Sequence, residues 1–99
     1  MFDGDATRGY LVECYWPGVS VEKLARIGGR ARAVASTLGT DVVFLGSILV
    51  PDDETVFCLF EGREDDVRAV TLRAGFPFER IVESLRIDPG SPTSKELAR

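Results

Sequence analysis

The apolar positions in the first part of the chain predict a strand followed by a long helix. Residues 9–16 are rich in aromatic and β-branched side chains, which favours a strand. Beyond it, apolar residues recur at spacings of three and four, the pattern of one buried helical face, and Ser20 can cap the start of that helix. The residues of this apolar face are Val21, Leu24, Ile27, Ala31, Val34, Ala35 and Leu38.

The remaining pattern predicts a hairpin, a short helix and a last strand. Residues 41–50 and 55–61 are apolar runs, and residues 51–54 between them have the composition of a turn. Residues 64–74 predict a helix, because acidic residues suit its positive end and apolar residues line one side. Residues 80–87 favour another strand.

This order of elements predicts an α+β fold of ferredoxin-like βαββαβ type. Two right-handed crossovers place both helices on one face of a four-stranded antiparallel sheet. With 99 residues, the chain is expected to form one domain over residues 9–87. Residues 1–8 are interpreted as a flexible leader and residues 88–99, which are polar and turn-rich, as a flexible tail.

The middle hairpin is apolar on both of its alternating faces, although a monomer would keep one face polar. A sheet that is apolar on both sides needs a second cover, and another copy related by a two-fold axis supplies one. The sequence therefore predicts a homodimer, a dimeric α+β barrel. Strict alternation groups Val43, Leu45 and Leu49 against Val42, Phe44, Ile48 and Val50, and Phe57 and Leu59 against Val56, Cys58 and Phe60.

Charge and composition exclude several classes of protein. The net charge of −4 and the pI of about 4.8 argue against nucleic-acid binding and against docking on anionic lipid. No apolar run approaches the ~20 residues that span a bilayer, and the polar start does not resemble a signal peptide. We therefore expect a cytoplasmic protein without a nucleic-acid or membrane partner.

The chain contains no histidine, which removes the commonest general base and the commonest transition-metal ligand. Histidine-based triads and histidine-ligated zinc or haem sites are excluded, and the sequence predicts no cofactor. The two cysteines, Cys14 and Cys58, lie on strands that should adjoin. We interpret them as inert buried thiols, although a disulfide between them is geometrically possible.

Three residues are the candidates for ligand binding: Glu13, Tyr15 and Glu83. Alternation in the first strand places the more apolar set with Cys14 beneath the helices, so Glu13 and Tyr15 should face the opposite side of the sheet, inside the predicted dimer. The first and fourth strands are neighbours in this fold, but the orientation of Glu83 stays open. Alternation alone does not fix it.

If Glu83 also points to the open face, two carboxylates lie side by side in a partly enclosed cavity. One pKa would then rise toward neutrality, or the pair could hold a hard cation. The alternative is that each glutamate pairs with an arginine, such as Arg80 or Arg86, or reaches solvent. Tyr15 could likewise donate a hydrogen bond to a ligand or simply pack in the interface.

Two features of the first helix allow more than one interpretation. Gly28 and Gly29 interrupt its middle, and close packing of helix on sheet at Gly28 explains them better than a phosphate loop does. Arg26, Arg30 and Arg32 fall mainly on its polar side, where a solvated face is the simple interpretation and an anion site the alternative.

Six short strings stand in a characteristic order along the chain: Tyr10-Leu11-Val12-Glu13, Pro17-Gly18, Leu38-Gly39, Pro51-Asp52, Phe57-Cys58 and Ala74-Gly75-Phe76-Pro77. These strings resemble a family of small ferredoxin-like dimeric α+β barrel proteins of unknown function, one branch of which is nickel-binding. They extend over about residues 10–87. The resemblance implies a metal or small-molecule ligand, and relatives often carry a histidine near the position of Val70. Because histidine is absent here, nickel binding does not carry over.

The sequence thus favours a small homodimeric module that binds a small molecule or a metal. Two alternatives remain open. One is a regulatory or interaction subunit. The other is a cofactor-free enzyme of isomerase or oxygenase type, which rests on analogy between folds alone.

Overall fold

The computed structural model describes residues 6–87, so the predicted tail and the first five residues of the predicted leader lie outside the described part. The elements follow the order βαββαβ, which confirms the predicted fold class. Their bounds are β1 (Ala6–Tyr15), α1 (Val21–Thr37), β2 (Val43–Val50), the single 3-10 turn η1 (Pro51–Asp53), β3 (Thr55–Glu61), α2 (Glu64–Ala74) and β4 (Phe78–Ile87).

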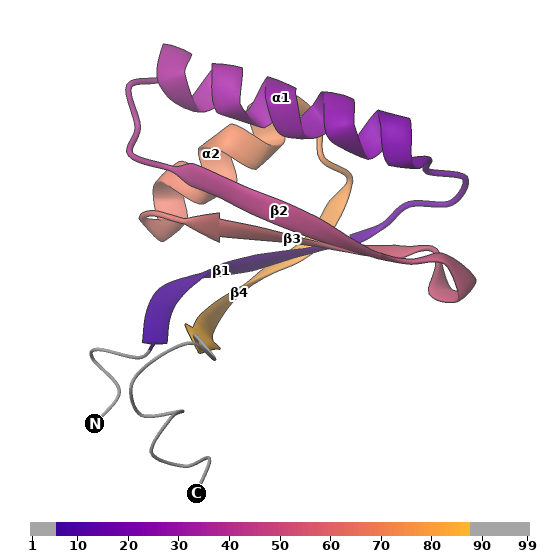
Figure 1. Ribbon diagram of the computed structural model, residues 1–99. Helices are drawn as coiled ribbons and strands as arrows, with labels where there is room; N and C mark the ends of the chain where they lie inside the picture. The colour runs from indigo at the N-terminus through magenta and orange to yellow at the C-terminus, as the bar shows by residue number, and fades with distance from the viewer. Residues whose placement is uncertain (1–5, 88–99) are drawn as a thin grey trace, which may run out of the picture.

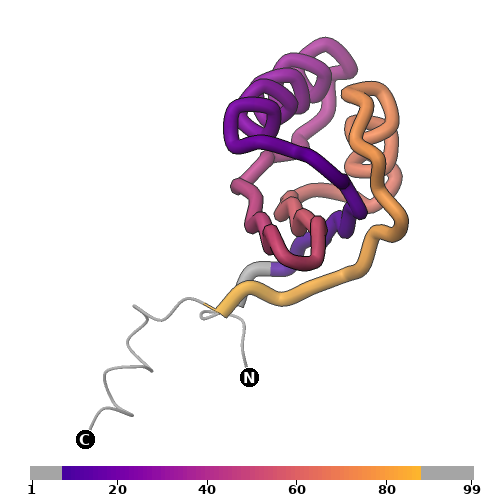
Figure 2. Tube along the Cα trace, turned by 90° about the vertical axis from the view of Figure 1, so that its right-hand side faces the viewer, coloured from indigo at the N-terminus to yellow at the C-terminus, as the bar shows by residue number. Residues whose placement is uncertain are grey.

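The four strands form one antiparallel sheet in the order β2-β3-β1-β4. Both helices cover the same face of this sheet, and the opposite face carries no element of the described chain (Figure 1). Figure 2 shows α1 and α2 side by side above the strands. The molecule therefore has two layers, one of helices and one of sheet, and we call the uncovered side of the sheet the open face.

β1 begins at Ala6 rather than at Gly9, because its first residues pair with the end of β4. Ala6 lies opposite Ile87, and Arg8 lies opposite Leu85. Residues 6–8 of the predicted leader are thus part of the sheet. At its other end β1 stops at Tyr15, and β4 starts at Phe78, which pairs with Cys14 across an irregularity in the ladder.

The core lies between the sheet and the two helices. Alternate residues of β1 and β3 face the helices, among them Val12 and Phe60, and both are almost completely buried. The predicted apolar face of α1 holds in its centre but not at its ends, because Val21 is 75% exposed and Leu38 is 37% exposed. The buried apolar residues are Val12, Cys14, Ile27, Ala31, Ala35, Val56, Cys58, Phe60, Val67, Val70, Ala74 and Phe76.

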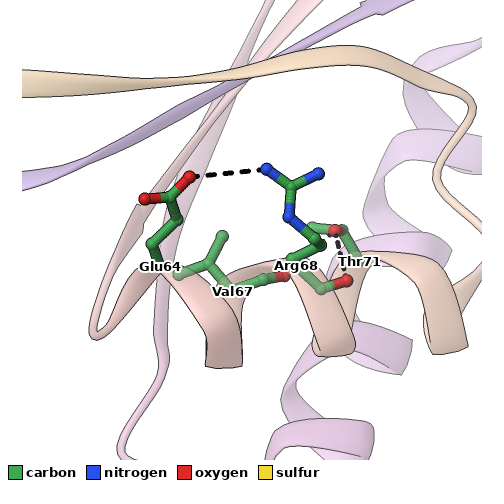
Figure 3. Close-up of polar contacts among 4 residues, drawn as sticks. All are labelled: Glu64, Val67, Arg68 and Thr71. Atoms are coloured by element: carbon green, nitrogen blue, oxygen red, sulfur yellow. Dashed lines mark hydrogen bonds and ion pairs between the residues drawn. The ribbon is translucent and has the colours of Figure 1, made fainter.

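α2 begins with the acidic run predicted for it, from Glu64 to Asp66. Within the helix, Arg68 contacts Glu64 one turn earlier, with 3.4 Å between Nη2 and Oε2 (Figure 3). The buried hydroxyl of Thr71 donates to the backbone carbonyls of Val67 and Arg68 at 2.9 and 3.1 Å. Its polar group is therefore satisfied within the helix and does not point a free donor into the core.

A bulge in β2 corrects the predicted grouping of the hairpin. The register shifts between Phe44 and Gly46, so one extra residue enters β2 there. After the bulge the alternation reverses, and Ile48 lies opposite Phe57 while Leu49 lies opposite Val56. Strict alternation, which placed Leu49 on the same side as Val43 and Leu45, was therefore wrong.

Candidate functional site

The open face carries apolar side chains across all four strands. Leu11 of β1 lies opposite Leu59 of β3 and Val82 of β4, and all three are only partly buried. On the edge strand β2, Ile48 is 55% exposed. Because side chains opposite one another in a ladder share a face, the registers assign the whole set. The apolar residues that the registers place on the open face are Leu11, Tyr15, Val43, Ile48, Val50, Phe57, Leu59 and Val82.

Glu13 lies on the open face, as alternation predicted, in register with Phe57 and Arg80. Its carboxylate accepts a hydrogen bond from Nε of Arg80 at 2.6 Å. The Glu13 side chain is 27% exposed and that of Arg80 is 69% exposed. A charge-assisted pair therefore lies among the apolar side chains of the open face, and it is the arginine pairing that the sequence left open as an alternative.

Tyr15 also lies on the open face, at the end of β1 beside Thr55. Its hydroxyl donates to the carboxylate of Glu54 at 3.2 Å, and the negative charge of Glu54 raises the pKa of Tyr15 above its usual value. Glu54 follows η1 and adopts the left-handed backbone conformation, with φ of 53°. Sequence reasoning missed this contact, because only the folded turn brings Glu54 back to the end of β1.

Glu83 lies on the other side of the sheet. It is in register with Tyr10, two positions before Val12, whose side chain is buried beneath the helices. Its carboxylate forms an ion pair with Arg8. Glu13 and Glu83 therefore point to opposite faces, and the pair of adjacent carboxylates that the sequence allowed does not form.

A second ion pair on the open face spans β1. The guanidinium of Arg86 on β4 contacts the carboxylate of Glu61 on β3, with 3.2 Å between Nη2 and Oε2. Gly9 of β1 stands between these two strands, opposite Ser84. A side chain at Gly9 would overlap the backbone carbonyl of Phe60, so glycine permits the close approach of β1 to β3 there.

Cys14 and Cys58 are diagonal neighbours on the helix side of the sheet, where Cys14 faces Val56 and Cys58 faces Val12. Both thiols are completely buried, and neither of these described residues is in a disulfide. Their mutual hydrogen bonding, followed by burial, raises the pKa of Cys14. The hydrogen bond with Cys14 lowers the pKa of Cys58, and a second hydrogen bond with Ser47, with 3.4 Å between Oγ and Sγ, lowers it further. Cys58 is the more acidic of two enclosed thiols.

The donor groups do not fit a nickel centre. Within residues 6–87, no three Cys, Asp or Glu side chains converge on a point where a metal ion could bind. Imidazole is absent from the chain, and the two thiols are buried together without further ligands. Val70, near which the resemblance expects a histidine, is completely buried in the core. None of the helices in the described range is long and apolar enough to cross a membrane.

The fold and this surface define a small ferredoxin-like α+β protein with an uncovered apolar sheet face. The chain belongs to the nickel responsive protein SCO4226-like family, whose model matches residues 10–83. A solved structure, that of SCO4226 from Streptomyces coelicolor A3(2), superposes with a TM-score of 0.67 at 24% identity, covering 75% of this chain and 91% of that chain. This likeness shows the fold. No curated protein matches the chain.

Proposed function

We propose that the protein is a homodimeric binding module in which two open faces pack together and enclose a ligand. The observation that carries the proposal is the apolar open face, where the registers place eight apolar side chains distributed over all four strands. A contiguous exposed apolar face on a small protein is typical of an interface. A second copy offers the same surface, and a two-fold axis closes the assembly after one contact.

Glu13 and Tyr15 are the ligand-binding residues of this proposal. They are two positions apart on β1 and therefore point to the same side, toward the partner copy. Arg80 balances the charge of Glu13, so a ligand at this place meets both an acceptor and a donor. A small polar organic molecule suits such a pair better than a metal ion, which would have to displace Arg80 from the carboxylate.

Glu83 is not included in this ligand site, because it lies on the helix side of the sheet and pairs with Arg8. Membership of a nickel responsive family supports a role linked to nickel. The donor set argues against direct coordination of nickel by this chain. We therefore place the proposed role in binding a small molecule within the dimer, not in holding the metal.

Substitution of Ile48 tests the proposed interface. Ile48→Glu puts a charge on the open face at a side chain that is 55% exposed, and we expect it to convert dimers to monomers, because an unpaired charge is costly in an apolar interface. Leu72→Glu is the matched control, since Leu72 is 63% exposed on α2, on the helix side. Sedimentation velocity measures the oligomeric state, and circular dichroism shows whether the helices remain folded.

The proposal predicts a monomeric Ile48→Glu variant with native helix content and a dimeric Leu72→Glu variant. If Ile48→Glu and the wild type sediment identically, the open face is not the interface. For the ligand, Glu13→Gln keeps the shape of the side chain and removes its charge. A ligand that binds wild-type and Glu13→Gln dimers equally well is not bound by Glu13.

A further inference from the structure

A pocket of about 410 Å³ lies on the helix side of the molecule, where the chain leaves β1 and enters α1. Its volume is in the range of small-molecule sites. The side chains that line it come from the residue that follows β1, one face of α1 and the last residue of α2. They are Trp16, Lys23, Arg26, Ile27, Arg30 and Ala74.

The lining divides into an apolar base and a cationic rim. Ile27 and Ala74 are almost completely buried, and Trp16 is partly buried against the same core. Lys23, Arg26 and Arg30 are exposed and stand three and four positions apart, which places them on one side of α1. The pocket therefore offers an apolar surface with an aromatic ring, beneath three positive charges.

These three cations have no acidic partner within residues 6–87. The ion pairs of that range use Arg8, Arg68, Arg80 and Arg86, and no Asp or Glu lines the pocket. The chain as a whole carries a net charge of −4. The pocket is therefore locally positive although the protein as a whole is negative. Its unpaired positive charges favour an anionic ligand.

We propose that this pocket binds a small organic anion with a planar apolar body and one carboxylate or phosphate group. The planar body would stack on the indole of Trp16 above Ile27. The anionic group would lie among Lys23, Arg26 and Arg30, because a guanidinium donates paired hydrogen bonds to carboxylate and phosphate oxygens. Arg32 takes no part, because its guanidinium lies over the ring of Phe44, 5.6 Å from the ring centre.

This site is independent of the proposed dimer, because it lies on the helix side of the molecule and the dimer uses the open face. Trp16 is the only tryptophan of the chain, so its indole N–H gives a single resonance in the NMR spectrum. Three probes of similar shape are titrated at constant ionic strength. They are naphthalene-2-carboxylate, 2-naphthyl phosphate and the neutral naphthalene-2-carboxamide.

We expect at least one of the two anions to shift the indole resonance saturably and the carboxamide to leave it unchanged. The comparison between carboxylate and phosphate then identifies the preferred anionic group. Arg26→Gln and Arg30→Gln should each weaken binding about tenfold, since each removes a charge-assisted hydrogen bond. Arg63→Gln is the control, an exposed arginine at the opposite end of α2 from Ala74.

Three results would overturn the proposal. The first is the absence of a saturable shift with either anion. The second is equal binding of the carboxamide, which would make the pocket merely apolar. The third is an equal loss of affinity in Arg26→Gln and Arg63→Gln, because that would reflect the net charge of the protein and not a site.

Discussion

The backbone of Gly28 on α1 lies against the ring of Phe44 on β2, so closely that a methyl carbon at Gly28 would stand 2.7 Å from Cε2. The same ring packs on Phe60 and Phe76, with ring centres 5.1 and 6.4 Å away. Phe44 therefore cannot yield without moving its aromatic neighbours. This contact sets the distance between the long helix and the edge of the sheet, and it confirms the packing role predicted for Gly28.

Alanine at Gly28 and at Gly29 should change stability in opposite directions. Gly28→Ala forces the helix away from Phe44, and overpacking of this kind costs about 1–3 kcal/mol. Gly29 is exposed and has no atom near an added methyl group, so Gly29→Ala should gain about 0.5–1 kcal/mol from helix propensity. Urea unfolding at one protein concentration measures both free energies. Stabilisation by both variants would contradict the close contact.

The ion pair of Glu13 and Arg80 should contribute more to the free energy of unfolding than its exposure in one protomer suggests. If the second copy of the chain covers this pair, Glu13→Gln leaves Arg80 enclosed without a counter-charge. We then expect the free energy of unfolding to fall by about 3 kcal/mol. Glu64→Gln is the comparison, because the pair of Glu64 and Arg68 lies exposed on α2 and should contribute less than about 1 kcal/mol. Equal and small losses in the two variants would show that Glu13 stays in solvent.

The contact between Tyr15 and Glu54 predicts a titration at high pH. Because the charge of Glu54 disfavours tyrosinate, the pKa of Tyr15 lies above the usual value of about 10. The contact therefore stabilises the fold fully below the pKa of an unfolded tyrosine, and this stabilisation is lost as the pH rises through the pKa of Tyr15.

Ultraviolet absorbance of tyrosinate measures this pKa in a Tyr10→Phe background, where Tyr15 is the only tyrosine. Glu54→Gln should lower the apparent pKa toward the unperturbed value. Asp52→Asn removes a charge from the same turn without removing the hydrogen-bond partner of Tyr15, and it should have a smaller effect. An unchanged pKa in Glu54→Gln would mean that the contact does not exist in solution.

Nickel should not bind to the purified, untagged chain with micromolar affinity. The thiols of Cys14 and Cys58 are enclosed, and no cluster of three candidate donors is present in residues 6–87. Isothermal titration with a nickel salt should therefore give no saturable heat. A tight stoichiometric isotherm would contradict this expectation, and a second titration of Cys14→Ala would then show whether a thiol is the ligand.

The sequence predicted the elements and the open face because those follow from local patterns. Alternation in β1 placed Glu13 and Tyr15 correctly, since no bulge interrupts β1 between them in the ladder with β3. The same reasoning failed in β2, where Gly46 allows a bulge that only the pairing with β3 reveals. Alternation cannot detect an inserted residue when both faces are apolar.

The site was less predictable than the fold, because contacts between distant residues decide it. The orientation of Glu83 depended on the register between β1 and β4, which pairs it with Tyr10. The contact of Tyr15 with Glu54 depended on the turn after β2. The sequence indicated three arginines on the polar side of the first helix. In the structure, Arg26 and Arg30 line the pocket together with Lys23, whereas Arg32 lies over the ring of Phe44.

Sedimentation equilibrium of the wild-type chain at micromolar concentration shows whether one open face covers another. We expect a mass twice that of the 10.8 kDa chain. A mass of one chain across the micromolar range would contradict it and would leave Glu13 and Tyr15 on an uncovered surface.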